Sequence, residues 1–141
     1  MFDILLVEDS PGDIRLTQEA LKEVNVNHIL HVVTDGEEAL KYLFREEPYT
    51  HASLPDIIML DLNLPKINGK EVLARIKEFP ELKRIPVIVL STSNAETDIM
   101  KMYDLHANCY ITKPVDFASY IEVIASIEKF WLNIVRLPTR L

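Results

Sequence analysis

The sequence contains a single cysteine, Cys109, so no disulfide bond can form within the chain. This favours a reducing, cytoplasmic compartment. Long hydrophobic runs are also missing, because no apolar stretch approaches the roughly 18 residues that a membrane span requires. We therefore expect the protein to have no membrane partner.

Positive charge is scarce, with 15 Lys and Arg residues against 22 Asp and Glu residues, for a net charge of −7. The electrostatic field of a negatively charged protein repels the phosphate backbone of nucleic acids, so we expect no direct binding of nucleic acid. A zinc site is not expected either, because the four histidines lack the ligand spacing to cysteines or acids that zinc sites show. These are His28, His31, His51 and His106.

What the chain does have is enough apolar residues to build a core. With 141 residues, of which 48% are hydrophobic, it matches one typical domain, and we expect residues 1–141 to form a single domain. Five short, nearly continuous apolar runs recur along the chain. Runs of this kind are typical of strands in a parallel sheet that helices cover on both faces. They are Ile4–Val7, Ile29–Val33, Ile57–Leu60, Val87–Leu90 and Cys109–Ile111.

The stretches that follow these runs carry helix start signals. In four of them a capping residue is followed within three residues by an acid, namely Ser10, Asp35, Asn68 and Ser93. Asp116 is the expected cap of the last helix. Residues 45–55 contain two prolines and are expected to form a surface loop. Alternating strands and helices predict an α/β fold, namely a doubly wound five-stranded parallel sheet with helices on both faces.

Polar residues follow the predicted strands at the edge where an open α/β sheet binds its ligands. Glu8 and Asp9 follow the first run, Asp61 the third, Ser91 the fourth and Lys113 the fifth. Any one of them alone is weak evidence, since chains surface at strand ends in every such fold. Three carboxylates at adjacent strand ends, however, repel one another unless a cation lies among them.

The residue types at this edge suit phosphoryl chemistry. Mg²⁺ prefers oxygen ligands and often combines one or two carboxylates with water and a phosphate oxygen. One oxygen of Asp61 is then available to the metal, while the other attacks phosphorus. Lys113 and the Ser91 hydroxyl are suited to contact the phosphoryl oxygens.

The last predicted helix, from about Phe117 to about Val135, has more apolar residues than one buried face requires. Residues at three- and four-residue spacing are expected to face the sheet: Phe117, Tyr120, Ile121, Ile124, Ile127, Trp131 and Val135. A second stripe of Val123, Phe130 and Leu137 lies roughly 90° around the axis. Because monomers seldom leave large apolar patches in water, this stripe predicts a homodimer. The alternative is that the tail folds back onto its own domain.

These motifs, in this order, resemble the response-regulator receiver domain of two-component signalling over essentially the whole chain. The segments that carry the resemblance are Val7-Glu8-Asp9, Asp61-Leu62-Asn63-Leu64-Pro65, Pro86 to Ser91, and Tyr110-Ile111-Thr112-Lys113-Pro114. The resemblance implies the flavodoxin-like strand order 2-1-3-4-5, a doubly wound order that receiver proteins share with flavodoxins. It also implies a cis peptide bond between Lys113 and Pro114.

The resemblance assigns a role to each site residue. Asp61 is the expected phosphoacceptor, Glu8 and Asp9 the acidic pair, and Lys113 the lysine that pairs with phosphate. Asn63 is expected to offer its backbone carbonyl to Mg²⁺. Ser91 and Tyr110 are expected to act as the switch residues. The sequence departs from the commonest family pattern in having Glu8 in place of Asp and Ser91 in place of Thr.

A narrower resemblance is to the single-domain regulators that serve phytochrome-type histidine kinases, carried by residues 7–13, residues 108–114 and Phe130-Trp131. It implies a sensor histidine kinase as the phosphodonor and an unidentified downstream protein as the target. Three alternatives remain open: a metal-dependent phosphatase, a flavin-binding electron carrier on the same fold, and a receiver that binds partners without being phosphorylated. The resemblance implies a signalling switch and not an enzyme, with self-phosphorylation from a phosphodonor and autodephosphorylation as its only reactions.

Overall fold

The computed structural model describes residues 1–23 and 27–138. All five apolar runs form strands, which pair in parallel in the order β2-β1-β3-β4-β5. Both the predicted fold and the implied strand order are therefore confirmed. The strands are β1 (Phe2–Val7), β2 (His28–Val33), β3 (Ile57–Asp61), β4 (Val87–Ser91) and β5 (Cys109–Thr112).

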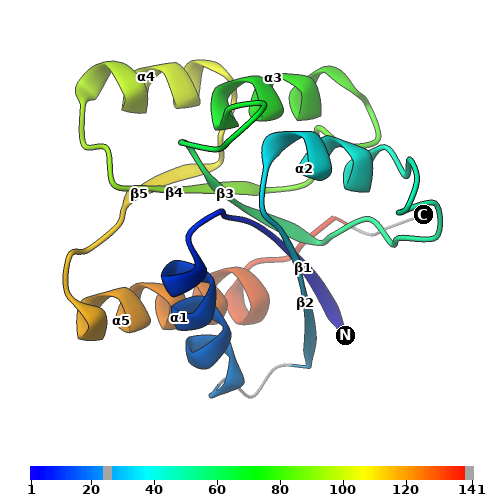
Figure 1. Ribbon diagram of the computed structural model, residues 1–141. Helices are drawn as coiled ribbons and strands as arrows, with labels where there is room; N and C mark the ends of the chain where they lie inside the picture. Colours follow the sequence, from blue (N-terminus) through cyan, green and yellow to red (C-terminus); the bar gives the residue numbers. More distant parts are fainter. Residues whose placement is uncertain (24–26, 139–141) are drawn as a thin grey trace.

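Helices cover both faces of the sheet, as Figure 1 shows. The helices α2 (Gly36–Leu43), α3 (Gly69–Glu78) and α4 (Glu96–Asp104) lie above it, and α1 (Pro11–Lys22) and α5 (Phe117–Ile127) lie below it. Each layer has its own apolar core. Every residue of β3 and β4 is buried, because both central strands are covered on their two faces.

Four of the five predicted caps are confirmed. The side chains of Ser10, Asp35, Asn68 and Asp116 each accept a hydrogen bond from the backbone N–H three residues further on. The prediction for Ser93 is wrong, because α4 begins after Ala95 without a side-chain cap. The Ser93 hydroxyl donates instead to Asp98 at 2.6 Å, a contact that ties the loop to the helix side chains.

The last helix has nearly the predicted extent but changes its hydrogen bonding. After α5 it continues as a π-helix, η1 (Glu128–Ile134), and the N–H of Val135 then donates to the carbonyl of Phe130, five residues earlier. The wider turn changes the buried stripe, so that Leu132 faces the core. Residues 139–141 of the predicted tail lie outside the described residues.

The predicted inward stripe is confirmed only in part. Tyr120, Ile124 and Ile127 are buried, and Trp131 is half-buried. Phe117 is 62% exposed, so its predicted inward position is wrong; it is the first residue of α5, where the helix starts beyond the core. In residues 1–23 and 27–138, no helix combines the length and apolar character needed to cross a membrane.

Candidate functional site

The register of the sheet brings the predicted site residues to one edge. Val7 pairs with Leu60, so Glu8 comes level with Asp61 at the carboxyl ends of β1 and β3. On the other side of β3, Ser91 ends β4 beside Thr112 of β5, and Lys113 follows directly. A parallel sheet thus places side chains from four segments of the sequence around one point.

Three carboxylates at this edge form a group that can hold a metal ion. One oxygen each of Glu8, Asp9 and Asp61 lies within 4.8 Å of the other two. Glu8 and Asp61 are buried, whereas Asp9 is exposed to solvent. An all-oxygen donor set of this charge suits a hard divalent cation, so the residues present fit such an ion.

Asn63 lies next to the acidic group. Its backbone N–H donates to Oδ1 of Asp61 at 3.4 Å, which holds the start of the β3–α3 loop against the strand end. This contact uses the backbone N–H of Asn63. The role of its backbone carbonyl as a metal ligand stays a prediction. Beyond it, the chain turns back toward the site: the N–H of Gly69 donates to the carbonyl of Leu62 at 2.9 Å.

Lys113 is the buried cation of the site, and three carboxylates share it. Its Nζ lies 2.6 Å from Oε1 of Glu8, 2.8 Å from Oδ2 of Asp13 and 3.5 Å from Oδ2 of Asp61. The contact with Asp13 is the functional feature that sequence reasoning missed. By sequence Asp13 is only an acidic residue at the start of a helix, although that helix begins four residues after β1, at the same edge of the sheet.

Burial and charge shift the proton affinities of this group. Burial raises the pKa of Glu8 to about 7, even though the hydrogen bond from Lys113 works in the opposite direction. Burial by itself lowers the pKa of Lys113, but its hydrogen bonds to Asp13 and Glu8 outweigh that effect and bring this pKa above its ordinary value. Lys113 is therefore a firmly charged ammonium.

The two predicted switch residues meet at Ser93. The buried Ser91 hydroxyl accepts a hydrogen bond from the N–H of Ser93 at 3.2 Å, and the Tyr110 hydroxyl donates to the carbonyl of Ser93 at 2.8 Å.

The peptide bond between Lys113 and Pro114 is trans, so the cis bond implied by the family resemblance is wrong for this structure. Among the described residues, the cis peptide bond is the one between Glu47 and Pro48.

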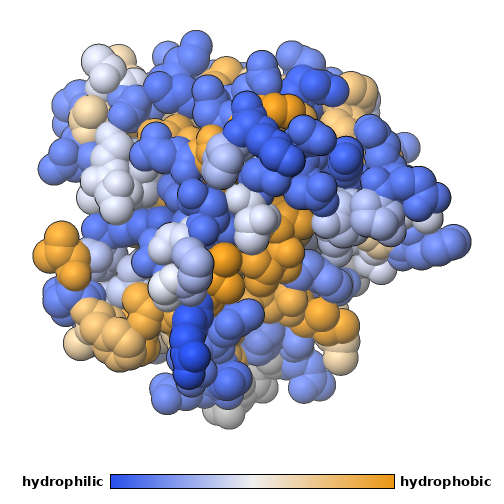
Figure 2. Space-filling view, viewed as in Figure 1, coloured by the Kyte–Doolittle hydropathy of each residue, from blue (hydrophilic) through white to orange (hydrophobic). Residues whose placement is uncertain are grey.

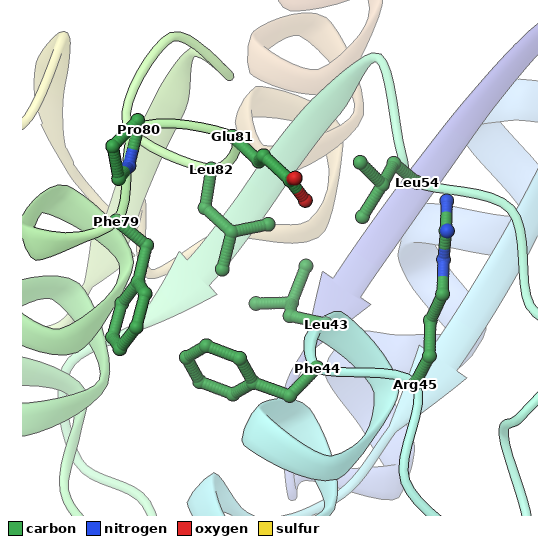
Figure 3. Close-up of a pocket in the computed structure, with 8 residues that line it drawn as sticks. All are labelled: Leu43, Phe44, Arg45, Leu54, Phe79, Pro80, Glu81 and Leu82. Carbon is green, nitrogen blue, oxygen red and sulfur yellow. The ribbon is translucent and has the colours of Figure 1, made fainter. Parts of the chain in front are cut away.

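A cavity of about 370 Å³ lies at the opposite end of the sheet, where α2 and α3 end (Figure 3). The Phe44 and Phe79 rings lie next to each other in its lining, edge to face, with centroids 4.7 Å apart. The other lining residues are apolar except for two charged ones: Leu43, Leu54, Pro80 and Leu82, with Arg45 and Glu81. None of the predicted site residues lines this cavity.

The residues of the second stripe lie along α5 and η1. Phe130 is 51% exposed, and Val123 and Leu137 are half-buried against the lower core. Val123, Phe130 and Trp131 line a shallow groove of about 450 Å³. Figure 2 shows hydrophobic surface over the part of the molecule where α5 begins.

A doubly wound sheet with an acidic metal site and a buried lysine at its carboxyl edge defines a receiver-type signalling domain. The chain belongs to the response regulator receiver domain family, whose model matches residues 4–125. It is 49% identical over 135 residues to response regulator Rcp1 of Synechocystis sp., an alignment that covers 96% of this chain and 92% of Rcp1.

Solved structures agree with this assignment. The Mn²⁺-bound form of Rcp1 is 47% identical with a TM-score of 0.96, covering 99% of this chain and 100% of that one. The phosphorylated cyanobacterial phytochrome response regulator RcpA is 54% identical with a TM-score of 0.96, covering 98% and 99%.

Membership of this family settles what kind of protein the chain is. It is a phosphorylation-dependent response regulator, a signalling domain and not a phosphatase or a flavin carrier. Its group of three carboxylates is a site for a divalent metal ion with oxygen ligands.

Proposed function

We propose that Asp61 accepts a phosphoryl group from a phosphohistidine of a sensor kinase. An oxygen of Asp61 attacks phosphorus, the phosphorus–nitrogen bond breaks, and the imidazole leaves and takes up a proton. The observation that supports this most directly is the position of Asp61 between a carboxylate group that can hold a metal ion and the Lys113 ammonium. One of its oxygens belongs to the metal group, and Oδ2 lies 3.5 Å from the Lys113 ammonium.

The other site residues have complementary roles in this proposal. The carboxylates of Glu8, Asp9 and Asp61 and the backbone carbonyl of Asn63 would hold Mg²⁺, which would offset the negative charge that otherwise repels a phosphodonor. Lys113 pairs with one phosphoryl oxygen and the Ser91 hydroxyl with another.

Phosphorylation adds charge where a single carboxylate stood, and Ser91 and Tyr110 respond to it in this proposal. Ser91 turns toward the phosphoryl group and gives up its hydrogen bond with Ser93. Tyr110, whose hydroxyl is bonded to the same residue, then changes position and shifts the equilibrium of the face formed by α4, β5 and α5.

The names of the relatives suggest the partners. Rcp1 is a response regulator and RcpA a phytochrome response regulator, so we propose a phytochrome-type histidine kinase as the phosphodonor in the cytoplasm. The target is a downstream protein that the single domain of residues 1–141 contacts directly. Self-phosphorylation from small phosphodonors and autodephosphorylation are the only reactions proposed for it.

We also propose a homodimer through Val123, Phe130 and Leu137. Phe130 stands out from the lower core and is half exposed, so a partner surface would remove it from water. Light scattering after size exclusion tests this. The wild type should be a dimer and Phe130→Glu a monomer, and a monomeric wild type would contradict the proposal.

Intact-mass measurement after incubation with acetyl phosphate tests the site itself. Wild type with Mg²⁺ should gain one phosphoryl group, whereas wild type with EDTA and Asp61→Asn with Mg²⁺ should gain none. Asp104→Asn is the matched control, because α4 ends with this aspartate at the other edge of the sheet, and it should be phosphorylated like wild type. Equal phosphorylation of Asp61→Asn would refute the assignment. No gain in any sample would favour a receiver that binds partners without phosphorylation.

A further inference from the structure

Asp13 is placed by its own helix to reach Lys113. Its N–H donates to the capping Ser10 hydroxyl at 3.3 Å, and its carbonyl accepts from the Thr17 hydroxyl at 2.9 Å, so both ends of its backbone unit are held. The carboxylate, 27% exposed at the side chain, extends to Lys113 across 100 residues of sequence. Helix capping alone requires neither this direction nor this contact.

The hydrogen bonds of Lys113 are unequally divided. An ammonium has three N–H donors, and the two short contacts of Lys113 go to Glu8 and Asp13. Asp61, the proposed phosphoacceptor, has the longest contact of the three. A phosphoryl group on Asp61 brings more negative charge and requires a share of the same ammonium.

We propose that Asp13 is a positioning residue that holds the Lys113 ammonium on the α1 side of the site and competes for it with the phosphoryl group on Asp61. This inference rests on the proposed function of Asp61. Asp13 is not one of the three residues of the metal group, so its effect on the reaction passes through the lysine.

The competition has a measurable consequence for phosphoryl binding. Asp13→Asn keeps an oxygen that accepts a hydrogen bond but removes the charge, and a charge-assisted hydrogen bond is roughly twice as strong as a neutral one. Lys113 then becomes more available to the phosphoryl group. We expect beryllium trifluoride, a phosphoryl mimic, to bind about fivefold more tightly to Asp13→Asn than to wild type in the presence of Mg²⁺, as measured by calorimetry.

Two further measurements separate positioning from a structural defect. Mg²⁺ alone should bind no more tightly to Asp13→Asn than to wild type, because the variant removes a negative charge near the site. The midpoint of urea unfolding should fall, because an ion pair is lost. A defect of folding would weaken mimic binding along with stability, whereas competition predicts lower stability and tighter mimic binding together.

Matched variants complete the test. Asp13→Glu restores the charge, so its affinity for the mimic should be close to that of wild type. Asp13→Ala should increase the affinity for the mimic at least as much as Asp13→Asn does. Glu71→Gln is the control, since Glu71 occupies the same place in the first turn of α3, with its N–H bonded to the capping Asn68, and has no contact with Lys113. It should leave mimic affinity unchanged.

The outcomes distinguish this inference from the proposed function. If wild type does not bind the mimic with Mg²⁺, the proposed function fails, and the competition has no phosphoryl group to act on and fails with it. If wild type binds and Asp13→Asn binds equally or more weakly, the positioning role alone is refuted. Equal behaviour of Asp13→Asn and Asp13→Glu would also refute it.

Discussion

Replacing Lys113 by methionine removes the positive charge of the site while nearly preserving the volume of the side chain. The ammonium contacts three carboxylates at 2.6, 2.8 and 3.5 Å. At an effective dielectric constant of about 20, each contact corresponds to roughly 5–6 kcal/mol of attraction. The desolvation of buried charges offsets much of this, and Glu8 takes up a proton more readily once its partner is lost. We therefore expect Lys113→Met to lower the free energy of unfolding by about 3–5 kcal/mol without metal.

Lys70 offers a matched control for burial. It pairs with Asp98 at 2.9 Å, much as Lys113 pairs with Asp13, but its side chain is 39% exposed, whereas that of Lys113 is 5% exposed. Exposed pairs are screened by water and contribute little, so Lys70→Met should cost about 0–1 kcal/mol. Urea unfolding in EDTA measures both values. Equal losses in the two variants would show that the buried ammonium does not balance the acidic group.

Mg²⁺ provides an internal check on the same reasoning. Without the ammonium, the three carboxylates of the metal group attract a divalent cation more strongly. If Lys113→Met binds Mg²⁺ about tenfold more tightly, saturating metal should stabilise it by about 1.4 kcal/mol more than it stabilises wild type. A smaller metal effect in the variant than in wild type would contradict this balance of charges.

Three further substitutions, one of them with a matched glycine control, test the fold. Gly36→Ala should lower the unfolding free energy by about 3 kcal/mol in urea, because its new Cβ would lie 1.8 Å from a backbone carbonyl oxygen, whereas Gly12→Ala meets only open contacts and should not destabilise. Ile124→Ala, at a fully buried position, should cost about 2–5 kcal/mol in the same assay. The hydrogen bond to Glu38 raises the pKa of Tyr49 to about 12 from an ordinary value of 10.0, so the folded state favours the neutral phenol. The stability difference between wild type and Tyr49→Phe should be fully present below pH 10 and shrink as the pH rises to 12.

The predictable part of this structure is the part that local pattern determines. Runs such as Ile57–Leu60 are buried on both faces, so their composition alone indicates strands of a covered parallel sheet. Parallel strands have their carboxyl ends at one edge, so Glu8, Asp61 and Lys113 are expected together from their places in the sequence.

The features that the sequence did not predict depend on contacts between distant segments. Asp13 is a common first-turn acid by its local pattern, and only the tertiary arrangement, in which α1 packs against α5, brings its carboxylate to Lys113. Ser93 has the spacing of a cap, yet its hydroxyl bonds Asp98. The π-helical turns after Ile127 move Leu132 inward, which no fixed 3.6-residue period anticipates.

Ser93 explains how a charge change at Asp61 can reach the surface of the molecule. Its N–H is bonded to the Ser91 hydroxyl, its carbonyl accepts from Tyr110, and its own hydroxyl donates to Asp98 on α4. In the proposed switch, a Ser91 hydroxyl that turns toward the phosphoryl group leaves the N–H of half-buried Ser93 without this partner, and a lost hydrogen bond of this kind costs about 0.5–1.5 kcal/mol. We expect the loop then to shift toward a new acceptor, and because Tyr110 and α4 are bonded to that same residue, both should move with it. In this proposal the link from the acidic edge to the α4 face is a short chain of hydrogen bonds through one serine.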